Sequence, residues 1–221
     1  VAIGAASNDG TGLNAGHVRV YKYTPGKGLI TNDNDVSFGP VGWTRLGKDI
    51  DGEAAGDESG YSVALSADGT IVAIGARFND GSGNLLADSG HVRVYRYTPS
   101  KTVAVTDQND LSFGPIGWTR MGADIDGEGN IEYSGSDIAL SADGTTVAIG
   151  AHGNDGTSSS VNNNNDKGSV RVYRYDANKT SAQMDQTLPN FGPRGWSRLG
   201  EDIDGEANSD YAGLAVSLSA D

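Results

Sequence analysis

The chain has 221 residues, of which 33 are glycine and none is cysteine, and its 29 acidic and 16 basic side chains give a formal net charge of −13. So negative a chain would repel nucleic-acid phosphates, and without cysteine it has neither disulfides nor a thiolate nucleophile. No apolar run approaches the roughly 18–20 residues of a membrane-spanning helix. We therefore expect neither a nucleic-acid-binding protein nor a membrane-spanning segment.

Five short segments recur three times along the chain. In the first copy they are Val-Ala-Ile-Gly-Ala (1–5), Gly-His-Val-Arg-Val-Tyr (16–21), Gly-Trp-Thr-Arg-Leu-Gly (42–47), Asp-Ile-Asp-Gly-Glu (49–53) and Leu-Ser-Ala-Asp (65–68). Self-similarity at a nearly constant period is the signature of repeat architectures. The recurrence divides the chain into repeats at 1–71, 72–146 and 147–221, the last of them incomplete at its C-terminal turn.

Each repeat predicts four short strands. Residues 91–97 alternate apolar and charged side chains, which is the period-two pattern of a half-buried strand, and no segment shows a helical period. Ala67-Asp68-Gly69-Thr70 is a hairpin turn that pairs the Val-Ala-Ile-Gly-Ala strand with the strand before it, so the sheets are offset from the repeat limits. We predict an all-β fold of β-propeller-type blades, each with four antiparallel strands. Closed propellers have about 4–8 blades, so we expect three to form part of a larger ring or array.

The motifs at 59–69, 72–76 and 90–95 resemble the FG-GAP repeat of integrin α-subunit propellers. They are still more similar to extracellular repeat proteins of aquatic microbes and algae, whose units run Trp-x-x-Leu-Gly-x-Asp-Ile-Asp-Gly-Glu into Ser-Ala-Asp-Gly and Val-Ala-Ile-Gly-Ala. The resemblance implies an extracellular β-propeller. In FG-GAP repeats calcium lies in an acidic loop between the first two strands, but here that loop is reduced to residues 67–70. Its one acid is too few for an ion that takes six to eight oxygen ligands, so the family's site does not carry over.

The acidic loop after each tryptophan strand is the strongest candidate for a metal site. It contains Asp49, Asp51, Glu53 and Asp57 in the first repeat, Asp124, Asp126, Glu128 and Glu132 in the second, and Asp202, Asp204, Glu206 and Asp210 in the third. Two interpretations stay open. Oxygen ligands on a flexible loop suit calcium, whereas Asp and Gly also build tight turns by bonding to nearby backbone amides.

Other recurring residues favour structural roles. Trp43, Trp118 and Trp196 occupy one position in each repeat, which favours packing between blades as structural anchors over stacking on sugar rings. His17 and His91 are equivalent and Ser169 takes their place in the third repeat, so we interpret the histidines as ordinary polar residues at strand starts. Asn178 lies in the one N-glycosylation sequon, Asn-Lys-Thr, in a predicted exposed loop.

An active site needs a nucleophile, acid or base that is placed once, whereas nearly every acid here recurs in all three repeats. We therefore predict no enzyme. We expect an extracellular or cell-surface structural protein, a building block of a filament, appendage or matrix, whose partners are copies of itself or further repeats of the same chain. The shared Ser/Asn-Phe-Gly-Pro sequences of the insertions favour this reading. The alternative is an integrin-like adhesion propeller, calcium-dependent, that binds an extracellular protein or glycan through loops 24–41, 98–116 and 176–194.

Overall fold

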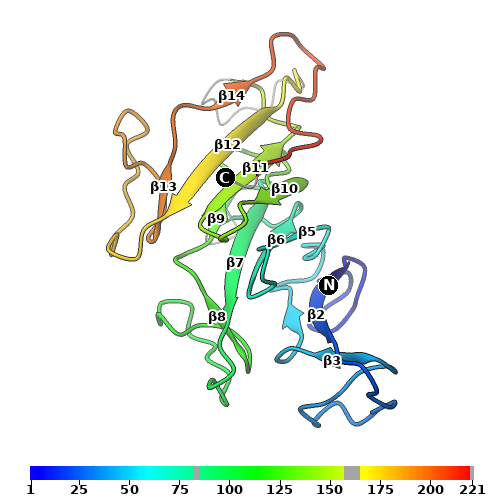
Figure 1. Cartoon of the computed structure of the whole chain (residues 1–221). Coiled ribbons are helices and arrows are strands. Elements are labelled where there is room, and N and C mark those ends of the chain that lie inside the picture. Colours follow the sequence, from blue (N-terminus) through cyan, green and yellow to red (C-terminus); the bar gives the residue numbers. More distant parts are fainter. Residues whose placement is uncertain (82–84, 157–164, 220–221) are drawn as a thin grey trace.

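The computed structural model describes residues 1–81, 85–156 and 165–219, and all regular structure in these ranges is β-strand. They contain no helix long and apolar enough to cross a membrane. The strands form three separate antiparallel sheets, one for each repeat (Figure 1). The all-β, antiparallel fold predicted from the sequence is therefore confirmed.

The strands of the three sheets correspond to one another. The first sheet contains β1 (Ala2–Ala5), β2 (His17–Tyr23), β3 (Trp43–Arg45) and β4 (Ile50–Asp51). The second contains β5 (Ser62–Leu65), β6 (Ile71–Ala76), β7 (His91–Tyr97), β8 (Trp118–Arg120) and β9 (Ile125–Asp126). The third contains β10 (Asp137–Leu140), β11 (Thr146–Ala151), β12 (Ser169–Tyr175), β13 (Trp196–Arg198) and β14 (Ile203–Asp204).

The strand pairing departs from the predicted four strands per sheet in one respect, and it confirms the predicted hairpin at the Asp-Gly turn. The Ile-Asp pairs form a fifth, very short strand beside the long central strand, because β8 pairs with one end of β7 and β9 with the other. The Val-Ala-Ile-Gly-Ala strand pairs with the strand before it, with Leu65 opposite Val72 and Leu140 opposite Val147. Within the described residues β1 pairs with β2 alone, so the first sheet has no outer strand on that side.

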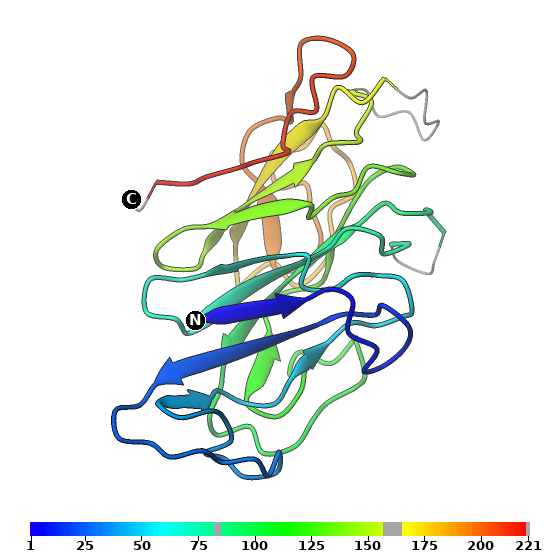
Figure 2. The ribbon, with the colours of Figure 1, turned by 90° about the vertical axis from the view of Figure 1, so that its right-hand side faces the viewer.

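The three sheets lie on top of one another, with the second between the other two (Figure 2). Because side chains alternate across a strand, each face of the second sheet has its own apolar set. Val72, Ile74 and Tyr95 pack with the first sheet, and Ile71 and Val94 pack with the third. The molecule thus has two apolar layers, each shared by two sheets.

A tryptophan and a glycine fix the distance between neighbouring sheets. Trp118 of the second sheet is fully buried, and its indole N–H donates to the carbonyl of Leu46 in the first sheet at 2.9 Å. A Cβ on Gly47, which has φ +64°, would lie 2.5 Å from the Trp118 Nε1. Glycine is therefore required here both by the close approach and by the left-handed backbone. Trp196 repeats the arrangement one sheet further, donating to the Met121 carbonyl at 2.8 Å above Gly122.

Substitution at equivalent tryptophans tests this arrangement. Trp118→Ala should lower the free energy of unfolding by about 3–5 kcal/mol, because it leaves a cavity between two sheets. Trp43→Ala is the matched control, since Trp43 is only half-buried and packs on Tyr23 of its own sheet. Its loss should be about 1–2 kcal/mol. Urea denaturation followed by circular dichroism measures both, and equal losses would contradict the proposed anchoring.

Candidate functional site

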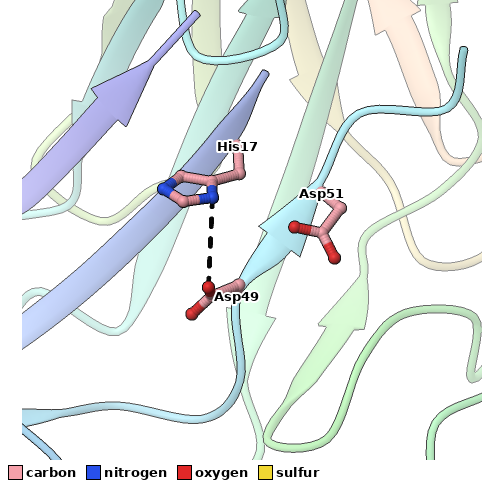
Figure 3. A group of neighbouring side chains, drawn as sticks. All are labelled: His17, Asp49 and Asp51. Carbon is pink, nitrogen blue, oxygen red and sulfur yellow. Dashed lines mark ion pairs between the residues drawn. The ribbon is translucent and has the colours of Figure 1, made fainter. Parts of the chain in front are cut away.

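The acidic loops lie against the start of the long central strand of each sheet. The second acid of each loop sits directly opposite the first residue of that strand: Asp51 opposite His17, Asp126 opposite His91, and Asp204 opposite Ser169. This pairing brings His17 together with Asp49 and Asp51, as Figure 3 shows. A second group consists of Glu53, His91 and Asp124, and its members come from two different sheets.

Within each group the potential ligand atoms lie within 4.8 Å of one another, so both groups could hold a metal ion. The groups differ from the sets expected from the sequence, because Asp49 and Asp51 separate from Glu53 and Asp57. They also include His17 and His91, which sequence reasoning interpreted as ordinary polar residues. Both imidazoles are buried, and the Nδ1 of His17 is 3.9 Å from Asp49.

In each repeat two arginines form ion pairs with the first aspartate of the acidic loop, an arrangement that we call the arginine clamp. Arg19 Nη2 and Arg45 Nη1 each lie 2.7 Å from a different carboxylate oxygen of Asp49. The same clamp recurs around Asp124 (Arg93 and Arg120) and Asp202 (Arg171 and Arg198). A buried carboxylate is stabilised when guanidinium groups pair with it, so these acids are satisfied without an ion.

The glutamate of the loop crosses to the next sheet. Glu53, which follows the first sheet, pairs with Arg93 of the second, and Glu128 pairs with Arg171 of the third at 2.9 Å. Gln186 adds a hydrogen bond to the same Glu128 oxygen at 2.8 Å. These acids therefore tie neighbouring sheets together.

The last acid of the loop folds back on its own backbone and also reaches the next sheet. Asp57 accepts from the Ala54 amide at 3.0 Å and from the Asn79 side chain at 3.0 Å. Glu132 takes the same two roles with the Glu128 amide and Asn154. In the third repeat Asp210 accepts from the Ala207 amide at 2.7 Å, while Asp204 and Glu206 are exposed and form no ion pair with the described residues.

Burial and the arginines set the electrostatics of the second group. Burial, reinforced by Arg93, lowers the pKa of His91 to about 3, so its ring is neutral at neutral pH. Burial would raise the pKa of Asp124, but Arg93 outweighs it and lowers that pKa to about 2. In the first group, burial and the neighbouring Asp49 raise the pKa of Asp51.

These groups suit some ions better than others. An imidazole beside carboxylates is a ligand set typical of transition metals, whereas calcium takes six to eight oxygens. Guanidinium groups also lie within hydrogen-bonding distance of the same carboxylates, and their positive charge repels a metal ion at these sites. Sequence reasoning missed these arginines, although they recur at fixed positions in all three repeats as regularly as the acids do.

The remaining candidates lie in structural positions. Trp118 and Trp196 are fully buried between sheets, so neither offers a ring face to a sugar. Asp68, in the hairpin turn at residues 67–70, accepts from the Ser66 hydroxyl at 2.7 Å and the Thr70 amide at 2.9 Å, as a turn residue does. Asn178 is exposed in a turn after β12, and its side chain is open to modification.

No protein-family model matches the chain, and no curated protein matches it either.

The pH dependence of stability tests the assignment of a neutral His91. The unfolded chain takes up a proton near pH 6.5, whereas the folded pKa is about 3, so the wild-type fold loses stability as the pH falls through this interval. The His91→Ser variant has at position 91 the serine that the third repeat has at position 169. We expect its free energy of unfolding to fall less over the same pH interval. The difference should grow by up to about 1.4 kcal/mol for each pH unit below 6.5. Parallel curves of unfolding free energy between pH 7 and about 4.5 would contradict the assignment.

Proposed function

We propose that this chain is a non-catalytic structural repeat protein of the cell surface or extracellular matrix. Its stacked sheets serve as β-propeller-type blades, and the protein is a building block of a filament, appendage or matrix. The resemblance to FG-GAP repeats, which are extracellular, supports the location. The stacking of successive sheets through equivalent residues supports the blade interpretation.

The observation that carries the proposal is that the recurring polar residues form bonds between neighbouring sheets. Arginine, glutamate and asparagine side chains that could serve chemistry instead join one sheet to the next, in the same way at both interfaces. Residues that repeat in every unit and bond to the neighbouring unit serve a role that every unit shares, which is stacking.

The long insertions also share their internal structure. In each one a lysine ammonium donates to the carbonyl of the glycine in the Phe-Gly-Pro sequence: Lys27 to Gly39, Lys101 to Gly114, and Lys179 to Gly192, at 2.8–2.9 Å. In each insertion the phenylalanine ring lies under an arginine that pairs with the acidic loop. The distance from the arginine Cζ to the ring centroid is 4.4–4.8 Å. Insertions built alike favour a shared packing role over recognition of different ligands.

An adhesion function is the second candidate, and one feature favours it. A cleft of about 670 Å³ is lined by residues of all three repeats, among them His91, Asn109 and Asp126 of the second and Met184 and Arg194 of the third. Its mixed lining suits a glycan or an extended peptide, and the group of Glu53, His91 and Asp124 borders it. If adhesion depended on calcium, calcium should raise the melting temperature of the chain. The arginine clamps argue against this, because the carboxylates that would bind calcium are already paired with guanidinium groups.

Labelling of the source cells tests the proposed function. Antibodies raised against the folded chain should decorate intact, unpermeabilised cells or their detached matrix, and immunogold electron microscopy should show label spaced regularly along an ordered structure. Antibodies adsorbed with the purified chain serve as the control. Label confined to permeabilised cells would contradict a surface or matrix role.

A further inference from the structure

The outer face of the third sheet repeats the surface that the first and second sheets present to their neighbours. Its Gly200 is equivalent to Gly47 and Gly122 and has the same left-handed backbone at φ +72°, but a Cβ at this position would meet no described atom within 4 Å. Ile203, equivalent to the buried Ile50 and Ile125, is 62% exposed. The place that receives a tryptophan at both internal interfaces is therefore open on the third sheet.

The outer face of the first sheet carries the other half of the same interface. Val1 is 56% and Ile3 51% exposed, whereas their equivalents Val72 and Ile74 are 0% and 2% exposed against the first sheet. Trp43 stands where Trp118 and Trp196 stand, and its indole N–H has no acceptor among the described residues. The first sheet thus presents the tryptophan, and the third sheet presents the glycine.

The polar partners are divided in the same way. Arg19 of the first sheet is equivalent to the arginines that pair with a glutamate from the preceding sheet, and Asn8 to the asparagines that bond the last acid of the preceding loop. The matching acids, Glu206 and Asp210, are exposed on the third repeat. Arg19 at one end therefore matches Glu206 at the other as a charge pair, and the Asn8 amide matches Asp210 as a hydrogen-bond donor.

The strand edges match as well. Residues 214–219 align with β5 and β10 but form no strand, and the Val216 amide donates to Asp137 at the start of β10 at 2.7 Å. Figure 2 shows this segment extended above β10. The first sheet, in turn, has no described strand at the outer edge of β1, where β5 and β10 lie in the other two sheets. Among the described residues, the segment 214–219 therefore pairs with no strand, and β1 has no neighbour at its outer edge.

We infer that the third sheet of one copy docks onto the first sheet of a second copy. Trp43 of the second copy enters beside Gly200, and residues 214–219 of the first copy add to the free edge of β1 as its outer strand. The contact joins two different surfaces, so it continues into a ring or a filament according to the rotation between copies. This inference rests on the proposed structural function and names its partner, which is the chain itself.

One residue should make the contact between two copies weaker than the contacts between sheets within one copy. Gln108 and Gln186 donate to the glutamate that crosses between sheets, but Asp33 occupies the equivalent position in the first repeat. Asp33 pairs with Arg45 and Lys48 of its own repeat, and at the contact between copies its carboxylate would face Glu206 with no hydrogen to donate. Asp33→Gln should therefore tighten self-association, by about tenfold for one recovered hydrogen bond.

Sedimentation velocity of the whole chain over a concentration series tests the docking. We expect species of two or more copies that grow with concentration, and a dissociation constant raised at least about tenfold by Gly200→Leu, which fills the tryptophan position. Gly69→Leu is the matched control, because Gly69 also has φ +72° and no atom within 4 Å, but lies in an exposed hairpin turn. The melting temperature of each variant shows that the fold is retained.

A mixing experiment distinguishes this contact from any other dimer. Trp43→Ala keeps an intact third sheet, and Gly200→Leu keeps an intact first sheet, so a mixture should form one-to-one pairs that do not grow further. A chain that stays monomeric at every concentration would overturn the inference, as would self-association that Gly200→Leu leaves unchanged or a mixture that forms no pairs. Each of these failures leaves the surface labelling untouched, so it would be distinguishable from failure of the proposed function.

Discussion

The contact between a tryptophan of one sheet and a glycine of the sheet before it governs the rest of this structure. Trp118 over Gly47 and Trp196 over Gly122 set the spacing between sheets, and each indole N–H donates to a backbone carbonyl of the sheet before it. A side chain at either glycine would force the sheets apart. The apolar layers, the crossing glutamates and the asparagine bonds all form at the distance that this contact sets.

The same constraint explains why the acidic loops are not simple ion sites. With the sheets this close, Glu53 and Glu128 reach arginines of the next sheet, and the clamped aspartates hold those arginines in place. The charges of the clamped aspartates and of Glu53 and Glu128 are thus balanced by arginines inside the stack. What remains is two groups of imidazole and carboxylate that could hold a metal, each beside at least one guanidinium.

The sequence predicted the strands well and the partners of their side chains poorly. Alternation at 91–97 and the Asp-Gly turn at 67–70 are local signals, so the strand class and the hairpins followed from them. The pairing of Glu53 with Arg93 is not local, because it joins two repeats, and spacing within one repeat cannot indicate it. The Ile-Asp strands were missed because two residues carry no period, and they form only where the central strand extends beyond β3, β8 or β13.

Hydrogen exchange of the three indole N–H groups, followed by nuclear magnetic resonance in the native protein, tests the central claim most directly. If the tryptophan–glycine contact holds the sheets together, the indoles of Trp118 and Trp196 exchange only when the stack opens, with protection close to that of global unfolding. Trp43, at the equivalent position with no described sheet before it, should exchange far faster at concentrations where the chain is monomeric. Equal and rapid exchange of all three would contradict the account.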